Sequence, residues 1–280
     1  PSGTAACATT SKGKLFCWGY NGQHKLLNIN EDASYILSTP TEIDLGEYVS
    51  EVHLGKYSIC AIVGQNRKVK CWGNSYWNNL GAQLSDQTLI GHTQATYVKF
   101  ETSNSQFVDL ENAYQIKGNY FGSRNCVTTY DNADTTLRCW GDNLDSAIND
   151  DLPVNHPYLA TTIDTSSNGE HIYKYANLSN TLCWIKGDKV YCKGGNAKGE
   201  VGQNSSTYEY SSIMSLSDKK LTDNQGNTYS NGDANAPTEV FDGVVDISGS
   251  YLHVCVVKND NTVWCWGSNW YWETGEANGG

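Results

Sequence analysis

Ten cysteines, spaced as five short-range pairs, constrain the fold more than any other feature of this sequence. The partners lie 9 to 13 residues apart, and none is left over. The pairs are Cys7 with Cys17, Cys60 with Cys71, Cys126 with Cys139, Cys183 with Cys192, and Cys255 with Cys265. Zinc sites usually offer two cysteines about two to four residues apart, and C-x-x-C redox motifs are absent. The spacing therefore predicts disulfides.

The segment between the two cysteines of a pair reads as two strands joined by a polar turn. Lys12-Gly13 stands in the middle of the first segment, residues 131–134 in the third and residues 259–261 in the last. Opposed side chains of a β-hairpin come within disulfide reach, so each pair is expected to join one hairpin. In the chain-entropy model, a bridge that closes a loop of about 10 residues contributes about 2 to 3 kcal/mol. Disulfides persist in oxidising compartments, which predicts a secreted or cell-surface protein; the alternative is ten reduced thiols in the cytosol.

Composition favours strands and argues against several partners. Hydrophobic residues make up 39% and charged residues 18%, while small polar residues and 18 tyrosines are abundant, which suits short strands and loops. The formal charge of -11 and the pI near 4.9 argue against a nucleic-acid partner, because phosphate contacts need clustered Lys and Arg. No apolar run approaches the roughly 20 residues of a spanning helix, so no membrane insertion is expected. The opening PSGTAACATT lacks the basic and apolar regions of a signal peptide.

The cysteine pairs mark a longer repeat. Successive second cysteines are 54, 68, 53 and 73 residues apart. Two short alternating runs precede each later pair, as in TPTEIDLGEYVSEVHLGKYSIC before Cys60 and APTEVFDGVVDISGSYLHVC before Cys255. A unit is therefore predicted to contain four strands, two from these runs and two from the cysteine hairpin. Four short strands that recur at roughly 50 residues, with polar turns between them, are what a propeller blade requires.

A specific pattern of residues is matched twice: P-x-x-V, then V-x-x-I-x-x-G, then C-A-L, then G-x-V-x-C-W-G-x-N-x-x-G-Q-x-G. The matching residues are Pro40, Val52, Gly55, Cys60-Ala61-Ile62, Val69, Cys71-Trp72-Gly73-Asn74 and Leu80-Gly81, and again Pro237, Val245, Ile247, Gly249, Cys255-Val256-Val257, Val263, Cys265-Trp266-Gly267 and Asn269. On these residues the chain resembles the regulator of chromosome condensation family of β-propellers, in the cysteine-bearing form common in secreted bacterial proteins. The fourth unit departs most, because Lys193 stands where the others carry Trp.

The resemblance implies an all-β fold, a β-propeller of four-stranded antiparallel blades with one disulfide-joined hairpin per blade. We expect a single domain over residues 1–280, with five units that end near residues 19, 73, 141, 194 and 267. Four units are expected to be complete. The first is expected to be half present, because six residues precede Cys7. Either the sequence is a segment of a longer chain, or strands of a neighbouring copy complete the half blade, since open strand edges recruit strands.

The Trp and Gly of the repeated C-W-G triplet have a structural interpretation. The indoles of Trp18, Trp72, Trp140 and Trp266 are expected to pack between adjacent blades, and the following glycine to permit a tight exit turn. His253 matches a histidine that the family often carries, which implies a hydrogen bond to the blade backbone. The equivalent positions hold Ala5, Ser58, Arg124 and Thr181, so a ring of catalytic or metal-binding histidines is not available.

Motifs that would indicate catalysis are absent from the sequence. There is no G-x-S-x-G, no H-E-x-x-H, no Gly-rich phosphate loop and no strict calcium loop. We therefore expect no enzyme activity, no cofactor and no dedicated metal site. The weak calcium candidates are Asp142, Asp145, Asp150 and Asp151, which share one loop and are more simply read as solvated turn residues.

Aromatic residues directly follow three of the triplets, at equivalent places that lie on one face of a propeller. They form a candidate platform for a sugar or a protein partner: Tyr20, Tyr76, Trp77, Trp270, Tyr271 and Trp272. The alternative is that these rings cover the hydrophobic ends of their own blades. Two sequons, at Asn177 and Asn204, are candidate glycosylation sites in a secretory setting.

These features favour an extracellular structural or adhesive surface protein, with copies of itself, other surface proteins or glycans as partners. Sharing of strand edges between copies would make it a filament or fibre subunit. The alternative is a secreted binding module, either lectin-like or resembling a propeller that inhibits another protein. A third class, an enzyme or a nucleotide-exchange factor like the founding member of the family, is disfavoured by the acidic pI and the paired cysteines.

Overall fold

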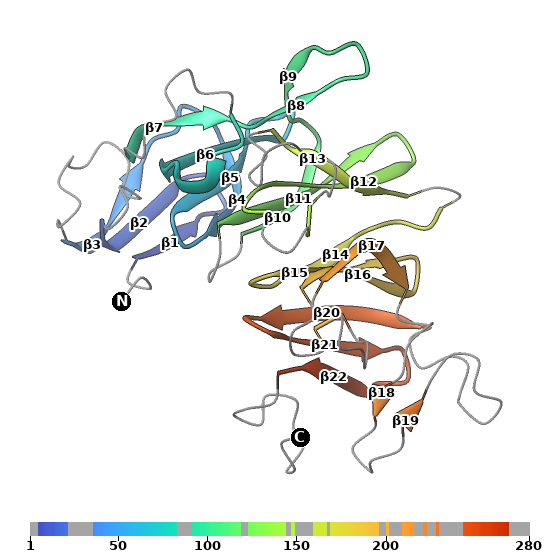
Figure 1. Cartoon of the computed structure of the whole chain (residues 1–280). Helices are drawn as coiled ribbons and strands as arrows, with labels where there is room; N and C mark the ends of the chain where they lie inside the picture. The colour runs from blue at the N-terminus through green and yellow to red at the C-terminus, as the bar shows by residue number, and fades with distance from the viewer. Residues whose placement is uncertain are drawn as a thin grey trace. The chain divides into compact units, whose positions relative to one another are not determined.

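The computed structural model describes residues 5–21, 36–82, 91–118, 123–143, 147–148, 159–166, 169–195, 200–201, 209–215, 221–222, 228–229 and 243–268. These ranges are built of antiparallel strands (Figure 1), with a short 3-10 turn, η2 (Tyr76–Asn78). The all-β prediction is confirmed. In the described part of the chain, no helix is long and apolar enough to cross a membrane.

The chain divides into two compact units, the first made of residues 1–132, 136–142 and 152–164 and the second of the remaining residues. In chain order the strands up to residue 165 are β1 (Ala5–Thr9), β2 (Leu15–Tyr20), β3 (Ile36–Ile43), β4 (Val49–Leu54), β5 (Ser58–Val63), β6 (Lys68–Asn74), β7 (Gly91–Tyr97), β8 (Lys99–Glu101), β9 (Phe107–Asp109), β10 (Ala113–Gly118), β11 (Arg124–Asp131), β12 (Asp134–Gly141) and β13 (Thr161–Thr165). The later strands are β14 (Lys174–Asn177), β15 (Thr181–Lys186), β16 (Lys189–Gly195), β17 (Glu209–Ser215), β18 (Leu221–Thr222), β19 (Thr228–Tyr229), β20 (Val244–Ser250), β21 (His253–Lys258) and β22 (Val263–Gly267).

Strand order follows chain order within every sheet. Three sheets have four strands, β4 to β7, β10 to β13 and β14 to β17, which confirms the predicted four-stranded antiparallel blade. In the described part of the chain, β1 to β3 and β20 to β22 form three-stranded sheets. Two further pairs, β8 with β9 and β18 with β19, are separate hairpins.

The first repeat contains one strand more than the sequence predicts. The run that contains Pro40 was expected to begin the second unit, but it forms β3 and pairs with β2, where Cys17 lies opposite Thr41. The cause is the meander, because the chain that leaves β2 returns along the same strand before it continues to the next sheet. The first sheet is therefore three-stranded instead of half present. The equivalent run at Pro237 lies outside the described residues.

Disulfides join the two middle strands of each of the three four-stranded sheets, β1 to β2 in the first sheet, and β21 to β22 in the last sheet. All five predicted pairs are bonded, with 4.1 Å between the two Cα atoms in each, and no described cysteine is free. Cys60 lies directly opposite Cys71 in the β5–β6 register, as Cys183 does opposite Cys192. The hairpin interpretation of the cysteine spacing is confirmed.

The hydrophobic core lies between consecutive sheets of each unit. In the first unit, Ile62 of β5 shares one buried cluster with Ile116 of β10 and Trp140 of β12. In the second unit, Val190 of β16 and Val254 of β21 belong to one cluster. Side chains on the facing surfaces of neighbouring sheets thus bury one another, as in other propellers.

The indoles of the C-W-G triplets connect neighbouring sheets. Trp72 is fully buried in a cluster with Leu15 of the preceding sheet. The Trp140 Nε1–H donates to the Asn79 carbonyl, 2.9 Å away, in the turn that follows β6. Trp266 makes the equivalent bond to the Glu200 carbonyl, at 2.8 Å. The predicted packing between blades is confirmed for these three indoles, and the last two also satisfy a buried carbonyl.

The glycine of the triplet lies at the end of its strand or one residue before that end. β12 and β22 end at Gly141 and Gly267. β2, β6 and β16 run one residue further, and their ladders to the next strand shift register between Cys and Gly, as at Cys71 and Gly73. The glycine φ angles lie between 95° and 115°, a region that L side chains rarely adopt. A Cβ on Gly141 would lie 2.2 Å from the Ser123 carbonyl oxygen. The glycine is therefore required by its positive φ and by the close approach of the neighbouring strand, and in β2, β6 and β16 it also lies at a β-bulge.

In the fourth repeat a lysine replaces the tryptophan and also donates a hydrogen bond to a backbone carbonyl. Lys193 is 8% exposed, and its Nζ donates to the Ile148 carbonyl at 3.3 Å. Ile148 lies nine residues after Cys139, as Leu80 does after Cys71, so the acceptor belongs to the equivalent connection. The aliphatic stem of a lysine can lie along apolar surface while its ammonium reaches a polar group. The departure from C-W-G thus keeps a donor at this position.

Candidate binding pocket beside the β8–β9 hairpin

One connection between sheets is much longer than its counterpart. Residues 44–48 connect β3 to β4, whereas residues 98–112 connect β7 to β10 and contain the β8–β9 hairpin, which projects beyond β7 in Figure 1. The ends of both connections are equivalent, because Val49 N–H donates to the Gly13 carbonyl and Ala113 N–H donates to the Arg67 carbonyl. Insertions in a repeat architecture map to loops and often build the binding face. The hairpin is therefore the feature that the repeat itself does not explain.

A cavity of about 590 Å³ lies between this hairpin and the end of the β11–β12 hairpin, within the first unit. This volume falls within the range of small-molecule sites, about 300 to 1,000 Å³. Its charged lining residues are Lys68, Lys99, Arg138, Asp109, Glu111 and Asp131. Three are cationic and three anionic, so the lining carries no net charge.

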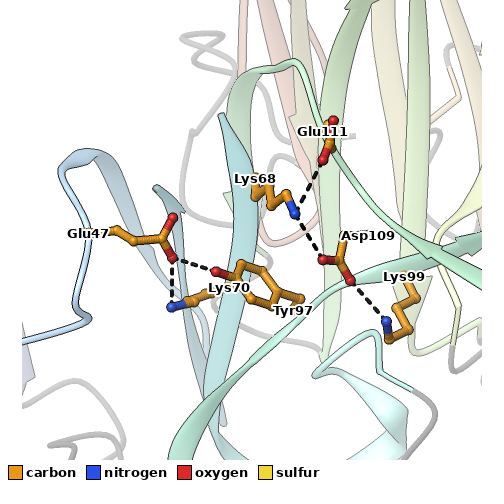
Figure 2. A network of polar contacts seen from close by, with 7 residues as sticks. All are labelled: Glu47, Lys68, Lys70, Tyr97, Lys99, Asp109 and Glu111. Atoms are coloured by element: carbon orange, nitrogen blue, oxygen red, sulfur yellow. Dashed lines mark hydrogen bonds and ion pairs between the residues drawn. The ribbon is translucent and has the colours of Figure 1, made fainter. Parts of the chain in front are cut away.

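The two lysines of the pocket form one ion-pair network with two of its carboxylates, Asp109 and Glu111 (Figure 2). Asp109 bridges two ammonium groups, with Lys68 Nζ at 3.1 Å from one carboxylate oxygen and Lys99 Nζ at 2.9 Å from the other. Lys68 also lies 3.3 Å from Glu111. Burial alone would raise the pKa of Asp109, but the hydrogen bonds from Lys99 and Lys68 outweigh it and lower that pKa. Asp109 is therefore ionised at neutral pH.

A second group of side chains extends the network along β6 and β7. Lys70 Nζ lies 2.8 Å from Glu47 Oε1, and the Tyr97 hydroxyl donates to the same oxygen at 2.5 Å (Figure 2). The Lys70 and Lys68 ammonium groups lie 4.6 and 5.2 Å from the centre of the Tyr97 ring. The bonds from Lys70 and Tyr97 lower the pKa of Glu47. These contacts restrain the strand that presents Lys68 to the pocket.

Arg138 closes the inner side of the pocket. Its Nη1 donates to the Thr129 hydroxyl at 2.5 Å, and its guanidinium lies 4.8 Å from the centre of the Phe100 ring. Burial lowers the pKa of Arg138, and Asp131 opposes that shift. The buried Nε–H has no hydrogen-bond partner among the residues that the structure describes. The guanidinium is thus positioned by protein contacts while keeping one donor unused.

Two aromatic rings stand at the rim of the pocket. Phe107, at the start of β9, is 41% exposed, and Tyr130, near the end of β11, is 43% exposed. Exposed rings of this size offer flat apolar surface to a ligand. The pocket therefore combines aromatic faces with charged groups that are already paired.

The predicted aromatic platform lies elsewhere in the repeat. Tyr20 is 38% exposed at the end of β2, and Trp77 lies half-buried in η2 with φ of 62°. The Tyr76 side chain, Trp270, Tyr271 and Trp272 lie outside the described residues. In the second sheet the platform residues follow the end of β6, whereas Lys68 of the pocket begins that strand. The platform stays a prediction.

The other candidate sites are not brought together in the described part of the chain. Asn177 is 8% exposed within β14, and Asn204 lies outside the described residues, so glycosylation at either sequon stays a prediction. Asp142 is buried after β12. The remaining calcium candidates lie outside the described residues: Asp145, Asp150 and Asp151. Among the described residues, no group of three His, Cys, Asp or Glu side chains could hold a metal ion.

Sequence reasoning missed the pocket, although a signal for it exists. The stretch KFETSNSQFVDL, residues 99–110, alternates apolar and polar residues around a Ser-Asn-Ser turn, which is the pattern of a hairpin. It falls in the 68-residue step between the second and third repeats. The pairing of Asp109 with Lys68, 41 residues earlier, depends on how that hairpin folds back and is not readable from local pattern.

Comparison with known proteins supports the repeat and the fold. The profile of the regulator of chromosome condensation (RCC1) repeat matches residues 244–269, which contain β20 to β22. No curated protein sequence matches the chain.

Solved structures with the same fold have low sequence identity. Prp20p from Saccharomyces cerevisiae superposes with a TM-score of 0.69 at 15% identity, over 98% of this chain and 58% of that chain. Human WBSCR16 gives a TM-score of 0.68 at 12% identity, over 95% of this chain and 60% of that one. Yeast RCC1 (Prp20) bound to Kap60 gives 0.65 at 16% identity, over 95% and 54%. This chain thus spans less than two thirds of each of these structures. Its sheet order, its repeat match at residues 244–269 and these superpositions show an RCC1-like β-propeller fold.

Proposed function

We propose that the chain is an extracellular adhesive module that binds its partner through the pocket beside the β8–β9 hairpin and performs no catalysis. The propeller fold with a disulfide in each of five sheets is typical of an extracellular binding or structural module. Such a module needs a rigid framework that tolerates varied connections, and the paired cysteines supply that rigidity. Partners of this proposal are glycans or other surface proteins, and the charge of -11 disfavours nucleic acid.

The observation that carries the proposal is the inserted hairpin with its pocket. At the equivalent connection between β3 and β4, a smaller cavity of about 270 Å³ lies beside Lys14 and Glu42, whose ion pair is exposed. The hairpin enlarges this place in the repeat to about 590 Å³ and adds aromatic rings to its rim. Binding residues commonly reside on connections held by a rigid scaffold.

The electrostatics of the pocket support binding over acid–base catalysis. A general acid at neutral pH needs a carboxyl group with a raised pKa. The pKa of Asp109 is lowered by its two lysines, and the pKa of Lys68 is raised by Asp109 and Glu111. Both shifts fix the charged forms, which suits hydrogen bonding to a ligand.

The chain itself provides the variant that tests this function. Replacing residues 99–110 with Asp44-Leu45-Gly46 would convert the long connection into the short one while keeping a leucine before the next sheet. Labelled wild-type and exchanged proteins are applied to arrays of glycans and purified extracellular proteins. We expect an unchanged fold by circular dichroism and loss of the ligand that the wild type retains. Retention of the same ligand by the exchanged protein would refute the proposed site.

A second candidate, a filament or fibre subunit built by strand sharing, is favoured by the first sheet. The strands β5, β11, β15 and β21 each lie between two neighbours, whereas β1 pairs with β2 alone among the described residues. An unpaired strand edge recruits strands from other chains. Mass photometry and negative-stain imaging test this candidate: we expect oligomers or fibres, and particles of one copy at micromolar concentration would rule it out.

A further inference from the structure

We propose that the pocket beside the β8–β9 hairpin binds a short neutral saccharide, with one sugar ring stacked on Phe107. This inference rests on the proposed function, because it names the ligand of that same site. It is carried by the charge balance of the lining, its mixed donors and acceptors, and the exposed rings at its rim.

Charge balance selects a neutral ligand. An anionic ligand drawn to Lys68 or Lys99 would come within reach of the Asp109 carboxylate, which already occupies both ammonium groups. A cationic ligand drawn to Asp109 would meet those same ammonium groups. Like charges at such short range disfavour either ligand in a partly buried site. A neutral ligand is repelled neither by the carboxylate nor by the ammonium groups.

The polar groups of the pocket match hydroxyl groups. Each carboxylate oxygen of Asp109 accepts one bond from a lysine and retains a second lone pair. An ammonium group has three donors, and one of those on Lys99 is used by Asp109. A sugar hydroxyl both donates and accepts, so neighbouring hydroxyls can bridge such carboxylate and ammonium groups without displacing their ion pair.

The rim rings supply the apolar part of the site. The face of a pyranose ring that carries C–H bonds packs on aromatic surface, and Phe107 offers such surface at 41% exposure. The pocket of about 590 Å³ leaves room for a short saccharide between this ring and Tyr130. A phenylalanine has no polar atom in its side chain, so stacking is the contact that Phe107 can contribute.

The network around the pocket reduces the entropy lost on binding. Asp109 is held by two lysines, Lys68 also contacts Glu111, and Arg138 is fixed by Thr129. Side chains that are already ordered lose less rotamer freedom when a ligand arrives. The site is therefore prepared for a ligand whose individual hydrogen bonds are weak, as those of a neutral sugar are.

Isothermal titration and NMR chemical-shift mapping on the full chain test the inference. The probes are cellotriose, maltotriose, chitotriose and lactose as neutral sugars, trigalacturonate as an anionic sugar, and an oligolysine peptide as a cationic ligand. We expect at least one neutral sugar to bind, with shifts at residues 99–112 and 129–131. Phe107→Ala should weaken that binding about tenfold, and Phe107→Tyr should restore it.

Tyr173→Ala is the control, because Tyr173 is 44% exposed, close to the exposure of Phe107, and does not line the pocket. We expect it to leave sugar binding unchanged; loss of binding in Tyr173→Ala but not in Phe107→Ala would move the site and overturn the inference. Tighter binding of trigalacturonate or oligolysine at residues 99–112 would overturn the neutral-sugar inference and leave the proposed binding site standing. Failure of all neutral sugars at millimolar concentration would overturn it too, while the connection-exchange experiment would still judge the proposed function.

Discussion

Substitution of Gly141 tests whether the close approach of a neighbouring strand to the C-W-G triplet depends on glycine. Gly141→Ala places a Cβ at φ of 95°, which costs about 1 to 2 kcal/mol in a left-handed region. The same Cβ would lie 2.2 Å from the Ser123 carbonyl oxygen, a backbone atom that cannot rotate away. Moving the neighbouring strand to relieve this contact disturbs a packed core, at a further cost of about 1 to 3 kcal/mol. The expected loss of unfolding free energy is therefore about 2 to 5 kcal/mol.

Gly46 is the matched control in the same unit. Its φ is 73°, and a Cβ there would meet nothing within 4 Å, so Gly46→Ala contains the backbone strain without the collision. We expect it to cost about 1 to 2 kcal/mol. Asparagine tolerates the left-handed region better than alanine, so Gly46→Asn should be milder still, whereas Gly141→Asn should be as damaging as Gly141→Ala.

Urea unfolding followed by tryptophan fluorescence measures all four variants, with the midpoint and the slope recorded separately. The collision predicts that Gly141→Ala is more destabilising than Gly46→Ala by at least about 1 kcal/mol. Equal midpoints for these two variants would show that the strand beside Ser123 moves at little cost. The interpretation of the triplet glycine as a position that only glycine can occupy beside the neighbouring strand would then be wrong.

Three further predictions concern the disulfides, the ion pairs and the lysine that replaces tryptophan. Changing Cys183 and Cys192 together to alanine should cost about 3 kcal/mol, measured by urea unfolding, and no change would contradict the loop-entropy estimate for a separation of 9 residues. The pKa of Asp109 is lowered below 3.8, so its contribution to stability is present above pH 3.8 and is lost as the pH falls through the lower, folded-state pKa. The stability difference between the wild type and Asp109→Asn should therefore shrink below pH 3.8, and a constant difference in pH-dependent unfolding would exclude this assignment. Lys193→Met keeps the buried stem but removes the donor to Ile148, so it should cost about 1 to 3 kcal/mol; a thermal unfolding midpoint equal to that of the wild type would argue that the bond is dispensable.

Local sequence pattern predicts those parts of this fold that depend on residues close together in the chain. The cysteine pairing follows from hairpin geometry, because partners such as Cys60 and Cys71 face each other across a turn. Sequence pattern does not predict which sheet the strand that contains Pro40 joins. An extended segment of that kind can pair with the strand before it or with the strand after it. In the structure this strand, β3, pairs with β2, so the first sheet has three strands.

The pocket was harder to predict because its parts come from separate segments. Lys68, Asp109 and Arg138 lie on β6, β9 and β12, and each is ordinary for a surface strand. Aromatic residues after the triplets attract attention because they recur, whereas Phe107 belongs to an insertion that occurs once. Repetition reveals the framework, and a departure from the repeat is the better guide to a binding site.

The fourth repeat shows which property of the triplet tryptophan the fold requires. Trp140 and Trp266 each donate to a carbonyl of the preceding connection, and Lys193 donates to Ile148 in the equivalent connection. An aromatic ring without a donor would fill the space but leave that carbonyl with one bond fewer. The lysine does the reverse, since it keeps the bond and fills less volume. Because lysine occurs here at a buried position, the hydrogen bond to the connection, and not aromaticity, is the feature that the three repeats share.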